Sequence, residues 1–316
     1  MRRLLLVNYH YVRETGAHTY PGIHPLSPEA FGRQLKHLAT QFHIAAPQEV
    51  EAFVLQGKEL PADSALITFD DGLLDHAETA RNILDPMGVK AVFFVCSRPL
   101  TEERAVSVHK IHWLRATTEP GQFRADFLAA LPQEWRERTL SDSEKQAAAA
   151  TYVYDQPRDA EIKYLLNFLL PEPVVDAATS AMLRTRGIDE VDFCRRTYMS
   201  GDVLRALVAA GHRVEAHTHD HRPVTRLGVE EDALMSLHIR ALEEILGRRP
   251  RWISYPYGRE WALPRDPGAF CRRHGFEIGV SLKGTWVKPE NAPYALDRIN
   301  TNEVEQVMGR PNVTAG

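Results

Sequence analysis

The stretch Ala65-Leu-Ile-Thr-Phe-Asp-Asp-Gly72 runs from five apolar or β-branched residues straight into two adjacent carboxylates and a glycine. Residues 65–69 are too few for a helix and are rich in strand-forming side chains, so the pattern predicts a buried strand. Successive side chains on a strand point to opposite faces, so Asp70 and Asp71 can reach one site only where the strand ends. Gly72 would permit the sharp turn that this requires.

Two carboxylates at the mouth of a strand are costly to hold together unless a cation or a shared proton accommodates them. A plain polar turn is the alternative interpretation, because Asp-Gly is a common turn dipeptide. Residues elsewhere in the chain distinguish between these two interpretations.

A second polar cluster, His217-Thr-His-Asp-His221, follows another predicted strand at residues 212–216. His217 and His221 could converge on one ion from either a helical turn or a compact loop. One added carboxylate completes a set of two imidazoles and an oxygen, which is typical of catalytic zinc sites that keep a position for water. A solvated histidine-rich loop is the alternative, and His219 and Asp220 are as compatible with facing solvent as with lining a pocket.

Strand and helix signals alternate through most of the chain, which predicts parallel β/α units. The expected strands number about seven and cover residues 4–9, 65–69, 90–95, 212–216, 251–255, 276–281 and 294–299. This number favours a closed or nearly closed barrel over a doubly wound sheet, and no nucleotide-binding glycine fingerprint occurs. In such a barrel the carboxyl ends of the strands converge on one face, which would gather the polar residues after them into one pocket. These residues are His10, Asp70, Asp71, His217, His221 and Tyr257.

Helices are expected between these strands. Ser27 as the N-cap residue, followed by a proline, marks the start of one helix, and Gly88 marks the end of another. From about residue 97 to 196 helical composition prevails and strand signals are few. The sequence therefore predicts a single barrel domain over residues 1–316, interrupted by a mainly helical insertion at about 97–196.

Composition excludes several classes of protein. The chain has 316 residues, of which 44% are hydrophobic and 25% are charged, and its formal net charge is −4. No basic excess favours nucleic acid as a partner, and no segment approaches the length of a membrane span. The apolar run at 4–7 is too short for a secretory signal, and Cys96, Cys194 and Cys271 form no Cys-x-x-Cys pair. A cytoplasmic enzyme with reduced thiols is expected.

Taken together, the motifs resemble those of the polysaccharide deacetylases, carbohydrate esterase family 4, with their NodB-like homology domain. Thr68-Phe-Asp-Asp-Gly72 is similar to the first motif of that family, and His217-Thr-His-Asp-His221 is similar to its second, His-Ser/Thr-x-x-His. Ser254-Tyr-Pro-Tyr-Gly258 resembles the third motif in a variant form, and Tyr9-His10 resembles the variant approach after the first strand.

The resemblance covers residues 3–96 and 198–300, about two thirds of the chain. It implies a distorted (β/α)7 barrel, a divalent metal ion and hydrolysis of an N-acetyl group. Zinc fits the implied ligands, and cobalt or nickel would fit almost as well. The implied substrate is an acetylated amino-sugar compound, either an intracellular biosynthetic intermediate or a glycan, and no oligomeric state follows from the sequence.

The resemblance also implies roles for individual residues. The metal would be held by Asp71, His217 and His221. Asp70 would be the general base that takes a proton from the attacking water. Pro256 would fix a rigid turn, and the backbone N–H of Tyr257 would help to stabilise the oxyanion.

The chain departs from the family pattern at two chemically important positions. The third motif usually carries an arginine that orients the base, but residues 253–255 contain none and the nearest is Arg251, which leaves Asp70 without a named partner. The usual general acid, a histidine in a Leu-x-x-His motif, does not occur after Tyr294. His10 occupies the place of that acid in a permuted branch of the family and is the predicted general acid, with a structural role under the barrel rim as the alternative.

Two residues of the last strand–loop units, Trp286 and Arg298, could form a wall for sugar stacking and an orienting cation. Core packing and a structural salt bridge are the alternatives for them. Two other functions stay open on the same scaffold: a metal-independent amide or cyclic-amide hydrolase, and a carbohydrate-binding protein without turnover. The presence of all three implied metal ligands favours the deacetylase.

Overall fold

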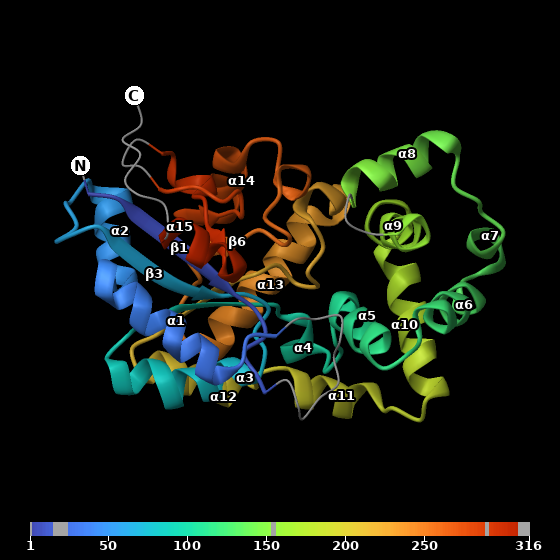
Figure 1. Ribbon diagram of the computed structural model, residues 1–316, viewed down its shortest axis with the longest axis horizontal. Coiled ribbons are helices and arrows are strands. Elements are labelled where there is room, and N and C mark those ends of the chain that lie inside the picture. The colour runs from blue at the N-terminus through green and yellow to red at the C-terminus, as the bar shows by residue number, and fades with distance from the viewer. Residues whose placement is uncertain (1, 15–24, 153–155, 288–290, 309–316) are drawn as a thin grey trace. The chain divides into compact units, whose positions relative to one another are not determined.

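The computed structural model describes residues 2–14, 25–152, 156–287 and 291–308. Its described residues form two compact units (Figure 1). The first unit contains all the strands and comprises the described residues of 1–18, 24–104 and 194–316. The second unit contains the described residues of 105–193 and is helical.

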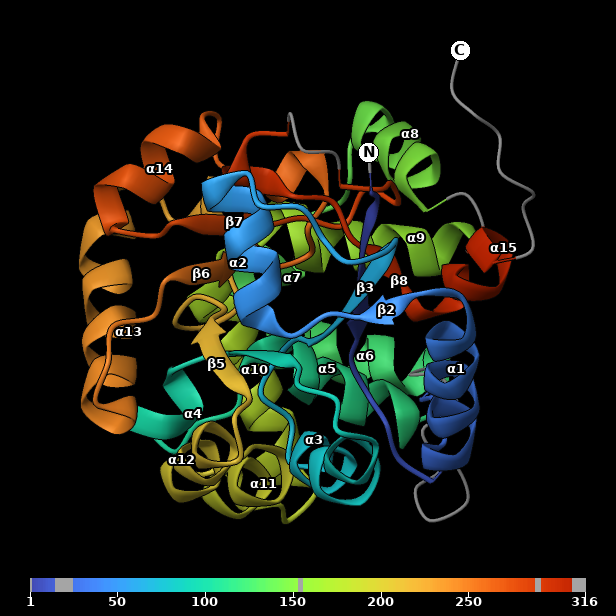
Figure 2. The ribbon, with the colours of Figure 1, turned by 90° about the vertical axis from the view of Figure 1, so that its left-hand side faces the viewer.

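One parallel sheet organises the first unit (Figure 2). Its strands follow the order β7-β6-β5-β4-β3-β1-β8, and a short β2 pairs with β3. The strands are β1 Leu4–Tyr9, β2 His43–Ile44, β3 Ser64–Phe69, β4 Val92–Val95, β5 Arg213–Ala216, β6 Trp252–Ser254, β7 Ile278–Val280 and β8 Ile299–Asn300. The predicted bounds of the first strand agree with β1, and β2 was not predicted.

The sheet curls until its two edges meet through a short extended segment. The N–H of Leu296 donates to the carbonyl oxygen of Gly279 at 2.8 Å, and the carbonyl oxygen of Leu296 accepts from the N–H of Ser281 at 2.8 Å. The segment before β8 therefore pairs with β7, which closes the sheet into the distorted barrel that the sequence predicted.

The last predicted strand, residues 294–299, is wrong in its bounds. A 3-10 turn at Pro293–Ala295 (η7) covers its start, and only Ile299–Asn300 forms β8. Pro293 explains the difference, because its fixed φ favours a turn and it has no N–H to donate to a neighbouring strand.

Alternate residues of the strands enter two separate cores, as the two-residue period of a strand requires. Leu4 and Leu6 of β1 pack in one apolar cluster, whereas Leu5 and Val7 pack in the cluster that also contains helical residues such as Phe31. The helices of the first unit that enclose the sheet are α1 Pro28–Gln41, α2 Pro47–Gln56, α3 Asp75–Thr79 with its continuations η1 Ala80–Leu84 and η2 Asp85–Met87, α4 Arg98–Thr101, α12 Gly201–Ala209, α13 Glu231–Leu246, α14 Pro267–His274 and α15 Val304–Met308. Short 3-10 turns lie at η4 Val224–Arg226, η5 Gly228–Glu230, η6 Glu260–Ala262 and η8 Thr301–Glu303.

Two of the predicted helix ends are confirmed. The hydroxyl oxygen of Ser27 accepts from the N–H of Ala30 at 3.1 Å and so caps α1. Gly88 ends the helical stretch before β4 with a left-handed φ of 69°. At these two positions, the capping residue and the glycine alone were sufficient to predict where a helix begins or ends.

The second unit contains no strand among its described residues. Its helices are α5 Ser107–Ala116, α6 Pro120–Ala130, α7 Gln133–Arg136, α8 Asp142–Thr151, α9 Pro157–Tyr164 continued by η3 Leu165–Leu169, α10 Glu172–Thr185 and α11 Glu190–Thr197, the last of which continues past residue 193. The buried ammonium group of Lys110 joins three of these helices, since it contacts Asp176 at 2.5 Å and Glu190 at 3.0 Å. The helices predicted for about 97–196 are present, and their description as an insertion in a single domain stays a prediction.

Within the described ranges, no helix is both long enough and apolar enough to cross a membrane.

The closure of the barrel leads to the first prediction. A β-carbon at Gly279 would lie 2.2 Å from the carbonyl oxygen of Tyr294 and 2.6 Å from the hydroxyl oxygen of Tyr255. We expect Gly279→Ala to lower the free energy of unfolding by about 3 kcal/mol, because backbone atoms must move apart to admit the methyl group. Urea unfolding measures this, with Gly121→Ala as the control, because beyond its chain neighbours and its own helix backbone no described atom lies within 4 Å of a β-carbon there. Equal losses in both variants would contradict the prediction.

Candidate active site

The predicted site residues gather where neighbouring parallel strands end. Tyr9 of β1 lies beside Phe69 of β3, and the N–H of Asp70 donates to the carbonyl oxygen of Tyr9 at 3.0 Å. His10 and Asp70 therefore leave adjacent strands at the same level. His217 follows β5 at the same end of the sheet, where its N–H donates to the carbonyl oxygen of Val95, the last residue of β4, at 3.0 Å.

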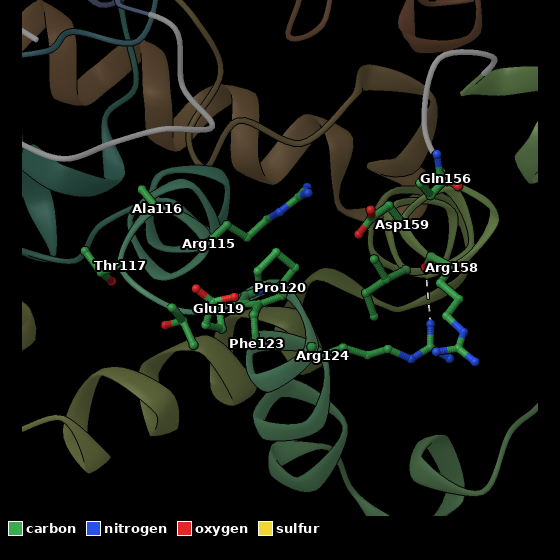
Figure 3. A pocket seen from close by; sticks show the side chains of 13 residues that line it. Arg115, Ala116, Thr117, Glu119, Pro120, Phe123, Arg124, Gln156, Arg158 and Asp159 are labelled. Atoms are coloured by element: carbon green, nitrogen blue, oxygen red, sulfur yellow. Dashed lines mark hydrogen bonds between the residues drawn. The ribbon is translucent and has the colours of Figure 1, made fainter.

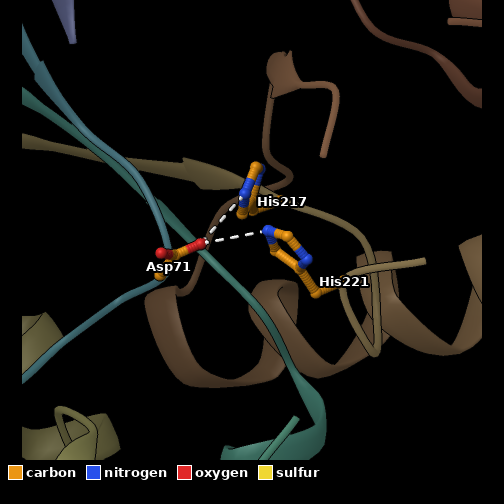
Figure 4. A group of neighbouring side chains, drawn as sticks. All are labelled: Asp71, His217 and His221. Atoms are coloured by element: carbon orange, nitrogen blue, oxygen red, sulfur yellow. Dashed lines mark ion pairs between the residues drawn. The ribbon is translucent and has the colours of Figure 1, made fainter. Parts of the chain in front are cut away.

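The side chains of Asp71, His217 and His221 converge on one point (Figure 4). Oδ1 of Asp71 lies 3.3 Å from Nε2 of His217 and 3.3 Å from Nε2 of His221. One possible ligand atom from each residue lies within 4.8 Å of the other two. A carboxylate oxygen and two imidazole nitrogens are a donor set that suits zinc and related divalent ions. The structure thus brings together the three predicted metal ligands, and their chemistry fits a metal ion.

A carbonyl group fixes the orientation of the His217 ring. Nδ1 of His217 lies 2.8 Å from the carbonyl oxygen of Ser254. A carbonyl oxygen only accepts, so Nδ1 carries a proton and Nε2 is the atom aimed at Asp71. Burial lowers the pKa of His217, but the carboxylates of Asp70 and Asp71 outweigh burial and raise it. Without a metal, a proton on His217 therefore stabilises the cluster, and a metal has to displace that proton.

Unusual backbone conformations hold the motif residues in place. Among the described residues other than glycine, positive φ occurs at Asp71, Glu103, Thr218, His221 and Tyr257, with φ of 82°, 51°, 63°, 62° and 65°. Four of these five residues belong to the predicted motifs. Left-handed conformations of this kind cost about 1–2 kcal/mol for residues with a β-carbon, so the surrounding contacts must maintain them.

The turn after β3 involves two left-handed residues. Gly72 has a φ of 74°, as the sequence predicted, and a β-carbon there would lie 3.0 Å from Cβ of Val95. Asp71 shares this conformation, which the sequence did not predict. The two consecutive left-handed residues turn Asp71 towards the histidines, while Asp70 keeps the inward direction of the strand.

Arg298 is the partner that the sequence left unnamed for Asp70. Nη1 of Arg298 donates to Oδ1 of Asp70 at 2.8 Å, and Nη2 donates to Oδ2 at 2.7 Å. This two-fold contact lies inside the barrel, where the Arg298 side chain is only 1% exposed. The contact agrees with either interpretation of Arg298 from the sequence, an orienting cation or a structural salt bridge, and a role in substrate binding stays a prediction.

The other donor groups of Arg298 are also used. Nε donates to the carbonyl oxygen of Ser281 at 3.0 Å, and Nη2 donates to the hydroxyl oxygen of Ser254 at 2.8 Å. Nη1 lies 3.0 Å from the amide oxygen of Asn8 and 3.2 Å from the hydroxyl oxygen of Thr68. The guanidinium group therefore links four strands of the barrel or their ends.

Asp70 is held as a carboxylate. Burial raises the pKa of Asp70, but the positive charges of Arg298 and then of His217 lower it to about 2. Oδ2 accepts from Asn8 at 3.1 Å, from Ser254 at 3.1 Å and from Arg298. Among the described residues, only Arg298 donates to Oδ1. Oδ1 is therefore the oxygen with capacity for another proton.

His10 lies near Asp70 with its side chain partly exposed. Its charge is among the causes that lower the pKa of Asp70. Nε2 of His76 contacts the carbonyl oxygen of His10 at 2.7 Å, and the His76 ring lies 5.0 Å from the ring of Phe69. His76 therefore fixes the backbone of the predicted general acid, and this contact was not predicted from the sequence.

The turn at Pro256–Tyr257 lies beside a predicted metal ligand. The N–H of Gly258 donates to the carbonyl oxygen of Tyr255 at 2.9 Å and closes the turn. The Tyr257 ring centre lies 5.0 Å from that of His221 and 5.1 Å from that of Trp261. Trp261 is 37% exposed.

Trp286 lies elsewhere, and the sugar-stacking wall predicted for it needs correction. Its ring centre lies 5.6 Å from that of Phe42 and 4.6 Å from the guanidinium carbon of Arg3. The next residue, Val287, bridges to Leu4 at the start of β1, at the opposite end of that strand from His10. Core packing explains Trp286, and Trp261 is the aromatic residue that lies beside the site.

Asn8 and Ser254 were not predicted as site residues, although the sequence contains a signal for them. Each is a fully buried polar residue in a strand whose other interior positions are apolar. A polar side chain inside a barrel needs a buried partner, which could have pointed to the ion pair of Asp70.

A separate cavity of about 1210 Å³ lies within the helical unit (Figure 3). It lies among the C-terminal end of α5 and the N-terminal ends of α6 and α9. Its charged lining residues are Arg115, Glu119, Arg124, Arg158 and Asp159. None of the predicted site residues lines this cavity.

Comparison with known proteins bears on this arrangement. A family model described as polysaccharide deacetylase matches residues 171–276. The matched segment contains the whole His217–His221 motif and the turn at Pro256–Tyr257. Over this segment the chain is similar to polysaccharide deacetylases.

Solved structures share the fold of this chain at low sequence identity. IcaB from Ammonifex degensii is 19% identical, with a TM-score of 0.59, over 97% of this chain and 96% of that chain. The deacetylase PplD from Streptococcus pyogenes, solved with acetate, is 15% identical, with a TM-score of 0.58, over 98% and 99%. A de-N-acetylase from Aggregatibacter actinomycetemcomitans is 14% identical, with a TM-score of 0.52, over 94% of each chain.

One curated protein also matches a part of the chain. The phenylalanine–tRNA ligase beta subunit of Porphyromonas gingivalis is 26% identical over 159 residues, which are 46% of this chain. The match spans only 19% of the length of that ligase subunit.

The ion pair of Asp70 leads to the second prediction. Arg298→Met leaves a buried carboxylate without its counter-charge, so we expect the free energy of unfolding to fall by about 3 kcal/mol near neutral pH. Arg33→Met removes an arginine that is 65% exposed and paired with Glu29, and we expect a loss below about 0.5 kcal/mol. Denaturant unfolding of the metal-free proteins measures both values, and similar losses would contradict the prediction.

The same variant tests the pKa of Asp70. Its folded value of about 2 lies below the ordinary value of 3.8, so its contribution to stability is present above pH 4 and is lost as the pH falls towards 2. In Arg298→Met this pKa rises, so we expect stability to decrease less between pH 5 and pH 2.5 than in the wild-type protein. Unfolding curves across this range, with Arg33→Met as the control, measure the difference, and parallel curves for all three proteins would refute it.

Proposed function

We propose that this protein is a member of the polysaccharide deacetylase family and a metal-dependent hydrolase that removes the N-acetyl group from an acetylated amino-sugar compound. The convergence of Asp71, His217 and His221 beside the ionised, buried Asp70 is the observation that carries the proposal. It supplies a metal-binding donor set and a base next to each other.

The residues that would hold the metal are Asp71, His217 and His221. A divalent ion bound there would act as a Lewis acid that makes water more acidic and polarises the acetyl carbonyl group. Zinc suits one carboxylate and two imidazoles, and cobalt or nickel would also suit them, because ligand type alone does not select among these ions.

Asp70 would be the general base. Water adds to the carbonyl carbon of the acetamide, and its proton passes to Oδ1 of Asp70, the oxygen with spare accepting capacity. Arg298 holds the plane of the carboxylate through both oxygens, so Oδ1 is positioned before the substrate arrives. The low pKa of Asp70 keeps the carboxylate in the charged form that accepts this proton.

His10 would be the general acid, and the turn at Pro256–Tyr257 would support the oxyanion. As the carbon–nitrogen bond breaks, the His10 imidazolium donates a proton to the leaving nitrogen, and the products are an amine and acetate. The backbone N–H of Tyr257 would donate to the developing oxyanion, a contact worth about 3 kcal/mol in other hydrolases.

Three observations support the substrate class. The family model is that of polysaccharide deacetylases, and two proteins of the same fold are a de-N-acetylase and a deacetylase solved with acetate. The partly exposed ring of Trp261 offers an apolar face of the kind on which a sugar ring can rest. A glycan or a smaller biosynthetic intermediate would fit this chemistry, and a cytoplasmic location stays a prediction from the sequence.

The third prediction concerns the base. We expect Asp70→Asn to lower the rate of acetate release from acetylated amino sugars and oligosaccharides by at least about 100-fold, because an amide cannot accept the proton. Metal content should persist, since Asp70 is not among the proposed ligands. Asp202→Asn, at a side chain that is 89% exposed, is the matched control. Full activity in Asp70→Asn would remove the proposed base, and glycan binding without acetate release by the wild-type protein would indicate a carbohydrate-binding protein.

The fourth prediction concerns the metal. Removal with a chelator should abolish acetate release, and zinc, cobalt or nickel should restore it. His221→Ala should lose the bound metal, whereas His274→Ala should retain it. His274 is a sharp control because it also lies in a group of possible ligands, with Glu231 and Asp232. Unchanged activity after chelation would instead favour a metal-independent amide hydrolase.

A further inference from the structure

A buried chain of hydrogen bonds lies beside the loop 217–221, which carries two of the proposed metal ligands. The hydroxyl oxygen of Ser97 lies 2.9 Å from Nδ1 of His219 and 2.8 Å from Nδ1 of His238. Nε2 of His219 lies 3.0 Å from Oε1 of Glu102. Ser97 and His238 are fully buried, and His219 is 5% exposed. We call these four residues the Ser97 relay.

The chemistry of the end groups determines which atoms of the Ser97 relay donate and which accept. The carboxylate of Glu102 only accepts, so Nε2 of His219 carries a proton, and Nδ1 of that ring can accept from the hydroxyl of Ser97. The Ser97 oxygen then accepts from a protonated Nδ1 of His238. This leaves Nε2 of His238 unprotonated, which agrees with its lack of any hydrogen-bond partner among the described residues. Burial lowers the pKa of His238 well below its ordinary value, so the ring is neutral.

The Ser97 relay joins the loop to two helices. Ser97 follows β4 and precedes α4, Glu102 follows α4, and His238 lies in the middle of the 16-residue helix α13. Glu102 is itself held by Nε of Arg98 at 3.2 Å. His219 is thus fixed from both sides, by a hydroxyl group on one ring nitrogen and a carboxylate on the other.

Backbone contacts from the same segment reinforce this attachment. The thiol of Cys96 contacts the carbonyl oxygen of His217 at 3.3 Å, and the N–H of Arg98 donates to the carbonyl oxygen of His219 at 2.9 Å. Each of the three consecutive residues 96–98 therefore makes a hydrogen bond to the loop. The loop needs such contacts, because Thr218 and His221 both have left-handed φ, which is unfavourable for residues with a β-carbon.

If these buried residues served only to fill the core, apolar side chains would do so without the need for hydrogen-bond partners. Burying a hydroxyl group and two imidazole rings is costly unless their hydrogen bonds are made, and a chain of such bonds specifies one arrangement of its members. Here the hydrogen bonds fix the side chain of His219, which lies midway between His217 and His221 in the sequence. A polar chain at this position therefore selects one conformation of the loop.

We propose that the Ser97 relay positions the loop 217–221 so that His217 and His221 face Asp71 at the distance a metal requires. Ser97, His219, Glu102 and His238 are then positioning residues, since none of them is a proposed ligand. This inference rests on the proposed metal site and adds the residues that set its affinity.

Metal affinity tests the proposal directly. We expect Ser97→Ala and His238→Leu each to weaken zinc binding by about tenfold or more, as the loss of residues that orient metal ligands commonly does. Ser97→Thr keeps the hydroxyl group and should restore most of the affinity. Ser64→Ala is the matched control, because it removes a buried hydroxyl that bonds to the carbonyl oxygen of Ala62 at the start of β3. Zinc titration against a chromophoric chelator and the visible spectrum of the cobalt form measure these changes. Wild-type affinity in Ser97→Ala would overturn the proposal.

A second measurement needs no variant and no metal. In the metal-free wild-type protein with ¹⁵N-labelled histidines, we expect His219 to carry its proton on Nε2 and His238 on Nδ1. The opposite tautomer at His238 would overturn the Ser97 relay even if Ser97→Ala failed to fold. A wild-type protein that shows these tautomers but binds no metal would refute the proposed function and leave the hydrogen-bond chain intact, so the two failures are distinguishable.

Discussion

The buried ion pair between Arg298 and Asp70 is the interaction on which the mouth of the barrel depends. Removing two charges from water is expensive, and their attraction compensates only when the remaining donors and acceptors are also paired. Here Arg298 satisfies its donors with Asp70, Ser254, Asn8 and groups on adjacent strands, all at distances of 3.2 Å or less. The same contacts that make the pair tolerable inside the barrel keep Asp70 ionised and fix its plane. Stability and the proposed catalysis therefore draw on one set of hydrogen bonds.

Two adjacent carboxylates acquire different properties because the backbone separates them. Asp70 continues the alternation of β3 and enters the barrel, where Arg298 neutralises it. Asp71 adopts a left-handed conformation, with a φ of 82°, and turns towards His217 and His221. The electrostatic cost of placing two negative charges side by side is thus divided between a guanidinium group and a cluster suited to a metal ion. Positive φ at His221 and Tyr257 shows that backbone strain is concentrated around this cluster.

Much of this arrangement could be predicted from the sequence because local signals were strong. The apolar runs of β1 and β3, the cap at Ser27 and the spacing of His217 and His221 each depend on neighbouring residues only. The pairing of Asp70 with Arg298 could not be predicted, because the two residues are 228 positions apart and the third motif contains no arginine. Trp286 was misplaced because an aromatic residue near a late strand gives no indication of which end of the barrel it occupies. The Ser97 relay was missed for a similar reason, since it joins residues from three separate segments.

The long separation between Asp70 and Arg298 also has a consequence for the order of assembly. During synthesis the chain emerges from its N-terminus, so β1 and β3 are available long before residue 298. Until that residue arrives, Asp70 lacks the guanidinium group that is the strongest of the charges lowering its pKa. The residues proposed to hold the metal, the last of which is His221, are complete earlier. The proposed base therefore depends on a residue that is synthesised after all the proposed metal ligands.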